Sequence, residues 1–381
     1  MPRNCSPAVF RLARWPAISE FPSLLCIGGF PPRPALSMIH LLLTETSKED
    51  TVSSYTRLVL TLIGFVLLIL LCLSVGARPI GLDGLIHGIF HFNGSANDVV
   101  VIYLRFPRVL QGLLVGAALG VGGAVIQGLT RNPLADPAVL GINGGASLAL
   151  VITSTCFHGT SLAWRCPIAF VGSATALLMV YSMSTLLSAG GLSSLVILGA
   201  VVAGLTASLT TTLLLSTGHD VTNIMYWLVG SLNGSDWPNV LMVLPLILAG
   251  LALSLTLAGR LNALRLGEDV AQALGVDMTR TRAWGTLAIL LLTAAAVAST
   301  GPIGFVGLLV AHIVRSVVGL DYRKVLPGSA IAGSSFLLLC DFLARTRLWV
   351  SYDEVPVGLV TACFGAPLLL FLLQRRRVYA T

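Results

Sequence analysis

Residues 105–146 read RFPRVLQGLLVGAALGVGGAVIQGLTRNPLADPAVLGINGGA, an apolar stretch in which every fourth residue of the first part is small. These small residues fall on one helix face and are Gly112, Gly116, Gly120, Ala124 and Gly128. Inside a bilayer, a face of small residues lets two helix backbones approach closely. The run ends at a polar turn and restarts at Asp136-Pro137, an N-cap residue followed by proline at the first helical position. The stretch predicts a helical hairpin that crosses a membrane.

The composition of the whole chain agrees with a membrane protein. Its mean hydropathy is +0.90, and 55% of its residues are hydrophobic and 10% charged, whereas a soluble domain carries roughly 25% charged residues. A helical span needs about 20 predominantly apolar residues. The candidate spans are 57–76, 108–129, 137–155, 167–188, 192–216, 238–259, 280–300, 305–319, 325–345 and 355–373. We therefore expect an all-α polytopic membrane protein with about ten transmembrane helices.

Lysine and arginine predict the orientation, because they concentrate in cytoplasmic loops. If residue 57 lies on the cytoplasmic side, the loops on that side hold more of them than the outer loops do. An even number of spans then returns the tail Arg375-Arg376-Arg377 to the same side, so we expect both termini in the cytoplasm. The net charge of +7 reflects this bias. No basic run is interleaved with aromatic residues, so we expect no nucleic-acid partner.

Residues 1–54 differ from the rest of the chain. They contain scattered charges, prolines at positions 2, 7, 16, 22, 31, 32 and 34, and no apolar run long enough for the core of a signal peptide. We interpret this segment as a disordered extension or as the product of an upstream start codon, with Met38 as the candidate start. A regulatory tail is the alternative. The transmembrane domain is then 55–381.

The cysteines and histidines predict neither a metal site nor a cofactor. No Cys-x-x-Cys pair occurs, and three cysteines lie within apolar segments. Cys156 and Cys166 fall in one loop expected on the outer side, which makes a local disulfide a hypothesis. His312 lies on a short span, where a packing or helix-end role is favoured over a ligand role.

The sequence lacks the residues of a self-powered pump or an enzyme. The two lysines, Lys48 and Lys324, do not follow the glycines of a phosphate-binding loop. Ion-driven carriers usually keep ionisable residues within their spans, yet Asp341 is the single acid that we place inside one, near its end. No nucleophile-base pair or His-Glu-x-x-His motif occurs. We expect a non-catalytic subunit whose energy comes from a partner.

The loop LNALRLGEDVAQALGV, residues 261–276, predicts a docking surface for such a partner. Leucines precede a break at Gly267, Glu268 and Asp269 suit a helix start, and Gly275 suits a helix end with positive φ. Two short helices beneath the membrane are expected, with Glu268 facing the partner. The alternative is a solvated connector, which would not need apolar residues on an exposed helix.

The stretch GPIGFVG, residues 301–307, predicts a helix break after residue 300. Gly301 and Pro302 end the helix, and Gly304 and Gly307 permit close backbone contact. We expect a re-entrant start to a short span at the outer face. The alternative is a plain turn.

Five linked blocks resemble one family. They are RFPR with GAxxQGLTRNPLADPxxLGINGGAS (105–147), LRLGEDVAQALGV (264–276), GPIGFVGLLVAHIVR (301–315), LLLCDFLAR (337–345) and EVPVGLVTACFGAPLLLFLL (354–373). Together they are similar to the permease subunit of the iron-siderophore, haem and vitamin B12 class of ABC importers, the FecCD family, over about residues 57–381. The sequence departs from the family at Ala311, where a proline usually precedes the histidine.

The resemblance implies the type II permease fold of ABC importers, in a multi-pass protein of the bacterial inner membrane. It implies a dimer with a second permease, either a copy or a paralogue, and a translocation path at their interface. Two cytoplasmic ATP-binding subunits and a periplasmic or lipid-anchored substrate-binding protein complete the assembly. The cargo implied is a ferric siderophore, because GSLNGSDW (230–237) is similar to the ferric-chelate members. Vitamin B12 and haem are the alternatives, and a channel or scaffold without a transport stroke is the alternative of a different class.

The resemblance also implies roles for single residues. Three arginines near span ends match those that receive acidic residues of the binding protein, although position alone equally allows anchors in lipid headgroups: Arg105, Arg108 and Arg345. The loop that contacts the ATPase is expected to use Leu264, Gly267, Glu268, Ala271, Leu274 and Gly275. Helix packing and gating are expected at Gly112, Gly116, Gly120, Gly301, Pro302, Gly304 and Gly307.

Overall fold

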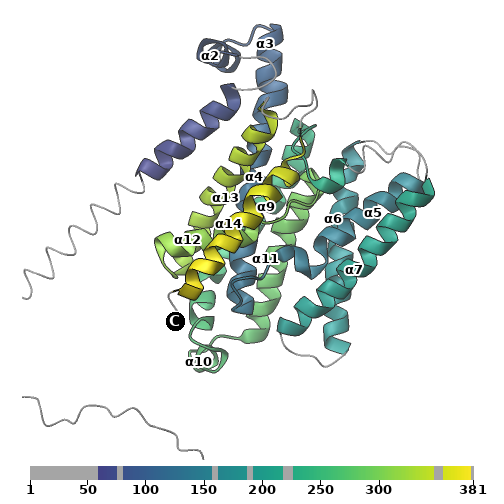
Figure 1. Cartoon of the computed structure of the whole chain (residues 1–381), viewed down its shortest axis with the longest axis vertical. Coiled ribbons are helices and arrows are strands. Elements are labelled where there is room, and N and C mark those ends of the chain that lie inside the picture. Colours follow the sequence, from purple (N-terminus) through teal and green to yellow (C-terminus); the bar gives the residue numbers. More distant parts are fainter. Residues whose placement is uncertain are drawn as a thin grey trace, which may run out of the picture. The chain divides into compact units, whose positions relative to one another are not determined.

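The computed structural model describes residues 59–74, 80–156, 162–186, 192–217, 226–346 and 355–378, which are helices and their connections without a strand. The chain divides into two compact units, Met1–Thr61 and Leu62–Thr381. The second unit holds the helices discussed below (Figure 1). The N-terminal extension 1–54 and the candidate start Met38 lie outside the described residues.

An apolar helix, Val59–Ser74, comes first among the described residues. The labelled elements that follow it are α2 (Leu82–Phe90), α3 (Ala96–Val99), the π-helical η2 (Val100–Arg105), α4 (Phe106–Thr130), the 3-10 helix η3 (Pro137–Leu140), α5 (Ile142–Cys156), α6 (Leu162–Leu186), α7 (Leu192–Thr217), α9 (Trp237–Leu264), α10 (Glu268–Ala273), α11 (Met278–Thr300), α12 (Val306–Val318), α13 (Tyr322–Arg345) and α14 (Val357–Val378).

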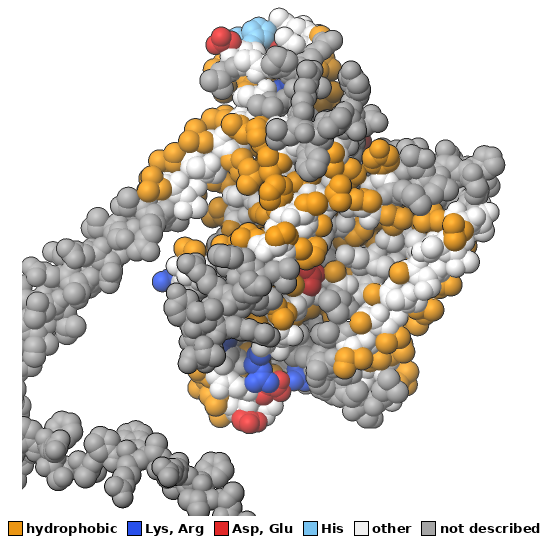
Figure 2. Space-filling model, viewed as in Figure 1, with side chains coloured by type: hydrophobic (Ala, Val, Ile, Leu, Met, Phe, Trp, Pro, Cys, Tyr) orange, Lys and Arg blue, Asp and Glu red, His pale blue; other side chains and the backbone are white. Residues whose placement is uncertain are grey.

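The prediction of an all-α polytopic membrane protein is confirmed. Six helices of the described chain are long and apolar enough to cross a membrane: Ala96–Thr130, Trp164–Ser184, Ile197–Ser216, Trp237–Leu264, Met278–Thr300 and Tyr322–Arg345. Shorter apolar helices lie at Val59–Ser74, Ile142–Cys156, Val306–Val318 and Val357–Leu369. Together these match the ten candidate spans. Hydrophobic side chains are spread over the face of the bundle that Figure 2 shows, as expected for a surface in contact with lipid.

Two predicted boundaries are wrong for reasons of backbone geometry. The second span begins at Ala96 rather than at Arg108, and its residues Val100–Arg105 are π-helical. Pro107 cannot donate a backbone hydrogen bond, and a π-helical turn before it is one way for a helix to continue through such a position. The third span is divided, because Asp136 caps a 3-10 turn that ends at Gly141 with φ 80° before α5 begins.

The centre of the bundle is α4, whose small residues bring other backbones close. A Cβ built on Gly116 would lie 2.5 Å from the carbonyl oxygen of Gly333 on α13, and one on Gly120 would clash with the carbonyl of Ser329. One turn on, Gly123 lies against the backbone of Gly307 on α12. Helix α4 packs against α13 and α12, while α5, which follows it in the chain, packs against α6 and α7.

The break after α11 is a junction of three chain segments. Helix α11 ends at Thr300, and a Cβ on Gly301, whose φ is 75°, would clash with the carbonyl of Trp227. The amide of Gly358 donates to the carbonyl of Gly230 at 2.9 Å. Gly304, by contrast, has nothing within 4 Å of the position of a Cβ. The expected close contact at Gly304 is therefore wrong, because its free face points into open space.

The disulfide hypothesis is also wrong. Cys156 and Cys166 are both free thiols. Cys166 lies within α6, not in a loop, and its buried thiol donates to the carbonyl of Ala298 at 3.2 Å. Cys156 ends α5 and is exposed. The connection 157–161 lies outside the described residues.

The loop at 261–276 holds one short helix instead of two. Helix α9 continues without a break to Leu264, so the leucines expected on a separate first helix are its last turns. Gly267, with φ 113°, then starts α10. Gly275 has the expected positive φ, at 82°.

We predict that Gly116→Ala destabilises the protein by about 1–3 kcal/mol, because the added methyl group meets backbone atoms of α13 that cannot move aside as a side chain can. The measurement is the thermal unfolding midpoint in detergent. The matched control is Gly259→Ala on α9, where a Cβ meets nothing within 4 Å, and which should keep or slightly raise the midpoint. Equal midpoints for the two variants would contradict the close contact.

Candidate functional site

Charged side chains gather at both ends of α4, and each cluster connects α4 to other helices. One cluster surrounds Asp341 of α13, near the end that carries α2 and α3. The other surrounds Glu268 of α10 and is visible in Figure 2 as blue and red side chains beside α10. These two clusters hold the ion pairs that join α4 to other helices in the described part of the chain.

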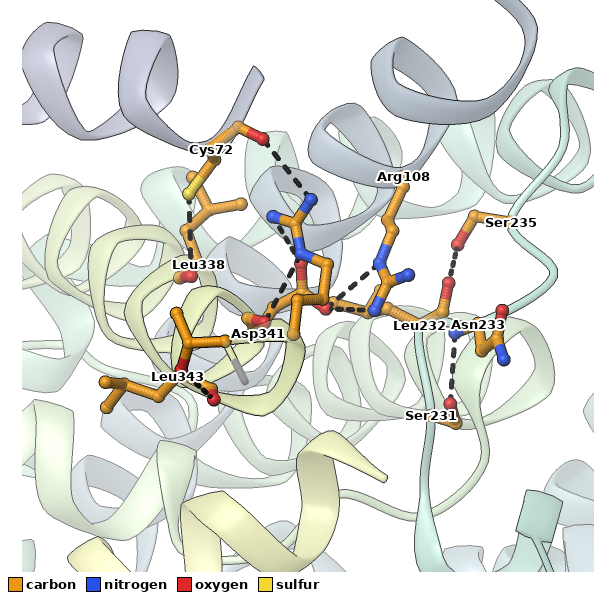
Figure 3. A network of polar contacts seen from close by, with 11 residues as sticks. Cys72, Arg108, Ser231, Leu232, Asn233, Ser235, Leu338, Asp341 and Leu343 are labelled. Atoms are coloured by element: carbon orange, nitrogen blue, oxygen red, sulfur yellow. Dashed lines mark hydrogen bonds and ion pairs between the residues drawn. The ribbon is translucent and has the colours of Figure 1, made fainter. Parts of the chain in front are cut away.

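The first cluster is a buried carboxylate held by two arginines (Figure 3). Asp341 is fully buried, and its Oδ1 accepts from Arg108 Nε at 3.1 Å and Nη2 at 2.8 Å. Its Oδ2 lies 2.9 Å from Nη2 of Arg345, one turn further along α13. Removing one partner of such a pair strongly destabilises the folded protein, since it leaves a buried charge without its partner. Asp341 therefore joins α4 to the end of α13.

The arginines also complete the end of helix Val59–Ser74. Arg105 Nη1 donates to the carbonyls of Leu73 at 2.6 Å and Ser74 at 2.8 Å. Arg345 Nη1 donates to the carbonyl of Cys72 at 3.3 Å. The last carbonyls of a helix have no partner within it, and a cation there also suits the helix dipole. These two arginines thus hold the first described helix against α4 and α13.

This geometry corrects the prediction of three arginines presented together at the surface. Arg105 is buried, and the side chain of Arg345 is 4% exposed, against 13% for Arg108. On a regular helix Arg105 and Arg108 would lie on nearly the same side. The helix between 100 and 105 is π-helical, and the two guanidinium groups bind different helices.

A polar turn within the stretch 230–237 lies beside this cluster, and sequence reasoning did not predict the contacts that Trp237 makes there. Asn233 donates its backbone N–H to Ser231 Oγ at 3.0 Å, in the turn drawn in Figure 3. Trp237, the first residue of α9, donates its indole N–H to the carbonyl of Ile102 at 3.0 Å and stacks on Phe106. A carbonyl is free for such a bond where the π-helical segment disturbs the regular pattern. A tryptophan at a span end is a signal that could have been used.

The second cluster joins α10 to two spans. Glu268 Oε1 lies 3.2 Å from Nη2 of Arg131, and its Oε2 lies 2.9 Å from Nη2 of Arg282. The expectation that Glu268 faces a partner is therefore wrong, since both carboxylate oxygens are engaged within the chain. Leu264 and Ala271 are fully buried, so these two expected contact residues belong to the core.

Three large apolar side chains of this loop are exposed, beside the exposed polar residues Asp269 and Gln272. Leu266 is 65% exposed and Leu274 is 63% exposed, and Val270 lies between them at 44%. Water-exposed loops seldom place three large apolar side chains together, and such groups mark interaction surfaces. We call Leu266, Val270 and Leu274 the α10 patch.

A second connection holds α9 to the start of α13. Asn262 donates to Asp321 Oδ1 at 2.6 Å, and its own Oδ1 accepts from the amide of Tyr322 at 2.9 Å. The amide of Asn262, followed by the backbone N–H of Arg323, lowers the pKa of Asp321 because both stabilise its carboxylate. Arg265 also donates to the carbonyl of Leu320 at 2.7 Å. These bonds hold the end of α9, next to the α10 patch, against the start of α13.

No described residues form a metal site. In the described ranges, no group of three or more His, Cys, Asp or Glu side chains is placed to hold an ion. His312 is buried on α12, in agreement with a packing role. A cavity of about 10 Å³ lies between α4, η3, α11 and Gly307. Thr293 Oγ1 and Asn143 Oδ1, both buried without a hydrogen-bond partner, come from residues that line it.

We predict that Asp341→Ala destabilises the protein by about 3 kcal/mol, because two largely buried guanidinium groups lose their carboxylate. The measurement is the unfolding midpoint in detergent, together with the yield of membrane-inserted protein. Asp83→Ala on α2 is the control, since that aspartate is exposed. An unchanged midpoint for Asp341→Ala would show that the cluster does not hold the three helices together.

The comparisons with known proteins agree with this architecture. The model of the FecCD transport family matches residues 63–375. The chain is 38% identical over 338 residues to the Fe(3+)-citrate import system permease protein YfmD of Bacillus subtilis, covering 87% of this chain and 98% of that protein. It is 40% identical over 283 residues to the cobalamin import system permease protein BtuC of Halobacterium salinarum, covering 74% and 75%. A solved structure titled as an inward-facing conformation of a metal-chelate type ABC transporter has a TM-score of 0.74 at 30% identity, covering 84% of this chain and 99% of that one. The chain belongs to the FecCD transport family and is a permease subunit of an ABC importer.

Proposed function

We propose that this permease is driven by two separate ATP-binding subunits and receives an iron chelate from an external binding protein. The observation that carries the proposal is the α10 patch, where three large apolar side chains stand exposed on a loop fixed to the bundle at both ends. An apolar surface outside the membrane is stabilised when a partner covers it. The chain supplies no phosphate-binding loop of its own, so the partner is the source of the ATP chemistry.

The α10 end is assigned to the cytoplasm. Arg131, Arg265, Arg280 and Arg282 all lie at or near this end, and lysine and arginine favour the cytoplasmic side of a span. Both termini are then cytoplasmic as well. The end with α2, α3 and the Asp341 cluster faces the periplasm or the cell exterior.

The external binding protein is assigned to the Asp341 end. Arg108 retains exposed surface there, so an acidic residue of the binding protein can approach it while it stays bound to Asp341. Arg105 and Arg345 then do not touch the binding protein, and instead hold in place the helices beside Arg108. Charge pairs of this kind steer encounter and fix register more than they add affinity. Lipid headgroups are the alternative partner for Arg108.

The cargo class follows from the relatives. A relative that matches this chain over 98% of its own length is named for ferric citrate, and the similar solved structure is titled as a metal-chelate type transporter. Cobalamin is the cargo named for a second relative, and haem remains an alternative. Identification of the ligand retained by the purified binding protein tests the assignment: an iron chelate supports it, and cobalamin or haem overturns it.

A second permease completes the path, either as a copy of this chain or as a paralogue. A channel or scaffold is the alternative of a different class. A rise in ATP hydrolysis when the binding protein is added would support the permease, because a channel or scaffold does not couple ATP hydrolysis to the binding protein.

We predict that Leu274→Asp reduces the amount of ATP-binding subunit that co-purifies with the permease by at least about tenfold, since a charge is desolvated in an apolar contact. Gln272→Asp is the control, because it adds the same charge to the same short helix at another exposed position. Both variants should insert into the membrane normally. Full retention of the ATP-binding subunit by Leu274→Asp would remove the α10 patch from the interface.

We predict that Arg108→Gln weakens the affinity for the binding protein about tenfold and makes its salt dependence less steep, because one charge pair is lost. Glutamine can still donate to Asp341, which limits the loss of stability. Arg165→Gln on α6 serves as the control on the same side of the bundle. Wild-type affinity and wild-type salt dependence in Arg108→Gln would mean that the residue is a lipid anchor.

A further inference from the structure

Helix α10 has six residues, and its first residue forms the ionic link to the rest of the bundle. The carboxylate of Glu268 binds Arg131 through one oxygen and Arg282 through the other, at 3.2 Å and 2.9 Å. A single side chain therefore connects α10 to two spans at once. In Figure 2 these charges lie together at the α10 end of the molecule.

The two arginines sit at the ends of the spans they belong to. Arg131 is the residue that ends α4, and it has the left-handed conformation, with φ 53°. That conformation is uncommon for a residue with a side chain. Arg282 lies in the first turns of α11. Each ion pair thus acts on a helix end, where a displacement moves the helix as a whole.

The remaining contacts of α10 are of a different kind. Ala271 is fully buried, and α10 packs against the end of α9. The α10 patch points away from the bundle. A partner that pushes on this patch is therefore linked to α9 by packing, and to α4 and α11 through Glu268.

We propose that Glu268 is the positioning residue that transmits a displacement of α10 to α4 and α11. This rests on the proposed function, in which an ATP-binding subunit docks on the α10 patch. Helix α4 runs from Arg131 to Arg108 at the opposite end, and α11 leads to the glycine junction at Gly301. Glu268 is thereby connected to the two elements that reach the outer end.

The link can be tested because the fold does not depend on it. The side chains of Arg131, Glu268 and Arg282 are 46%, 33% and 27% exposed. Ion pairs this exposed contribute little to folding stability. Glu268→Gln keeps the shape and one acceptor oxygen, so it should insert and bind its partners, while the double ionic link is lost.

The experiment uses the full permease with its ATP-binding subunits in lipid vesicles, with the binding protein added as the stimulus. Glu268→Gln should retain the ATP-binding subunit and keep basal ATP hydrolysis within about twofold of the wild type. Stimulation by the binding protein should fall at least about fivefold. The stimulus acts at the Asp341 end and hydrolysis is measured on subunits at the α10 end, so this readout reports the link without knowledge of the cargo.

The matched control is Asp269→Asn, which removes an equal charge from the next position of the same helix. Asp269 is exposed, and this variant should behave as the wild type in all three measurements. Arg131→Gln should also lower the stimulation, and the double variant should resemble Glu268→Gln alone, because Glu268→Gln already removes both ion pairs.

Three outcomes would overturn the proposal. Wild-type stimulation in Glu268→Gln would show that the ion pairs transmit nothing. An equal loss in Asp269→Asn would assign the effect to the net charge of α10. If the wild-type permease itself retains no ATP-binding subunit, the proposed function fails first and the role of Glu268 with it.

Discussion

The contact between the backbones of α4 and its neighbours is the constraint on which the rest of the structure depends. In lipid, the burial of apolar surface does not drive helices together. Helices associate instead by packing closely through small residues. The glycines of α4 bring the backbone of α13 against one part of its surface and the backbone of α12 against another. A second set of close backbone contacts, the glycine junction at Gly230, Gly301 and Gly358, joins the segment before α9, the end of α11 and the start of α14.

Close packing at the centre moves the ionic groups to the ends. No side chain as large as arginine fits between backbones that touch, so the guanidinium and carboxylate groups gather where helices end and leave carbonyls without partners. At one end they join helix Val59–Ser74, α4 and α13; at the other they join α4, α10 and α11. Helix α4 takes part in both clusters, which makes it the element that both ends of the molecule share.

The sequence predicted the class of fold and the helix count because hydropathy and length are local properties. It also predicted the small-residue face of α4, although not that this face meets α13. That choice depends on a contact between residues more than two hundred positions apart, such as Gly116 and Gly333. The candidate site was predicted less well. From their spacing we expected Arg105 and Arg108 on one side of a helix, but the segment before Arg108 is π-helical and the two side chains bind different helices. From its hydrophobicity we expected Leu264 on a surface helix, but α9 continues to this residue and buries it.

The length of the helix Ala96–Thr130 has a consequence for the bilayer itself. Its 35 residues correspond to roughly 50 Å at about 1.5 Å per residue, against a hydrocarbon core of about 30 Å. Even a tilt of about 40°, near the upper end of what such helices adopt, leaves about 40 Å along the membrane normal. The first turns must therefore rise into the headgroup region, where exposed Tyr103 and the neighbouring Phe92 suit an interfacial aromatic belt. Bilayer thickness thus acts on the tilt of this helix through hydrophobic mismatch, and lipid composition becomes a variable of the protein's activity.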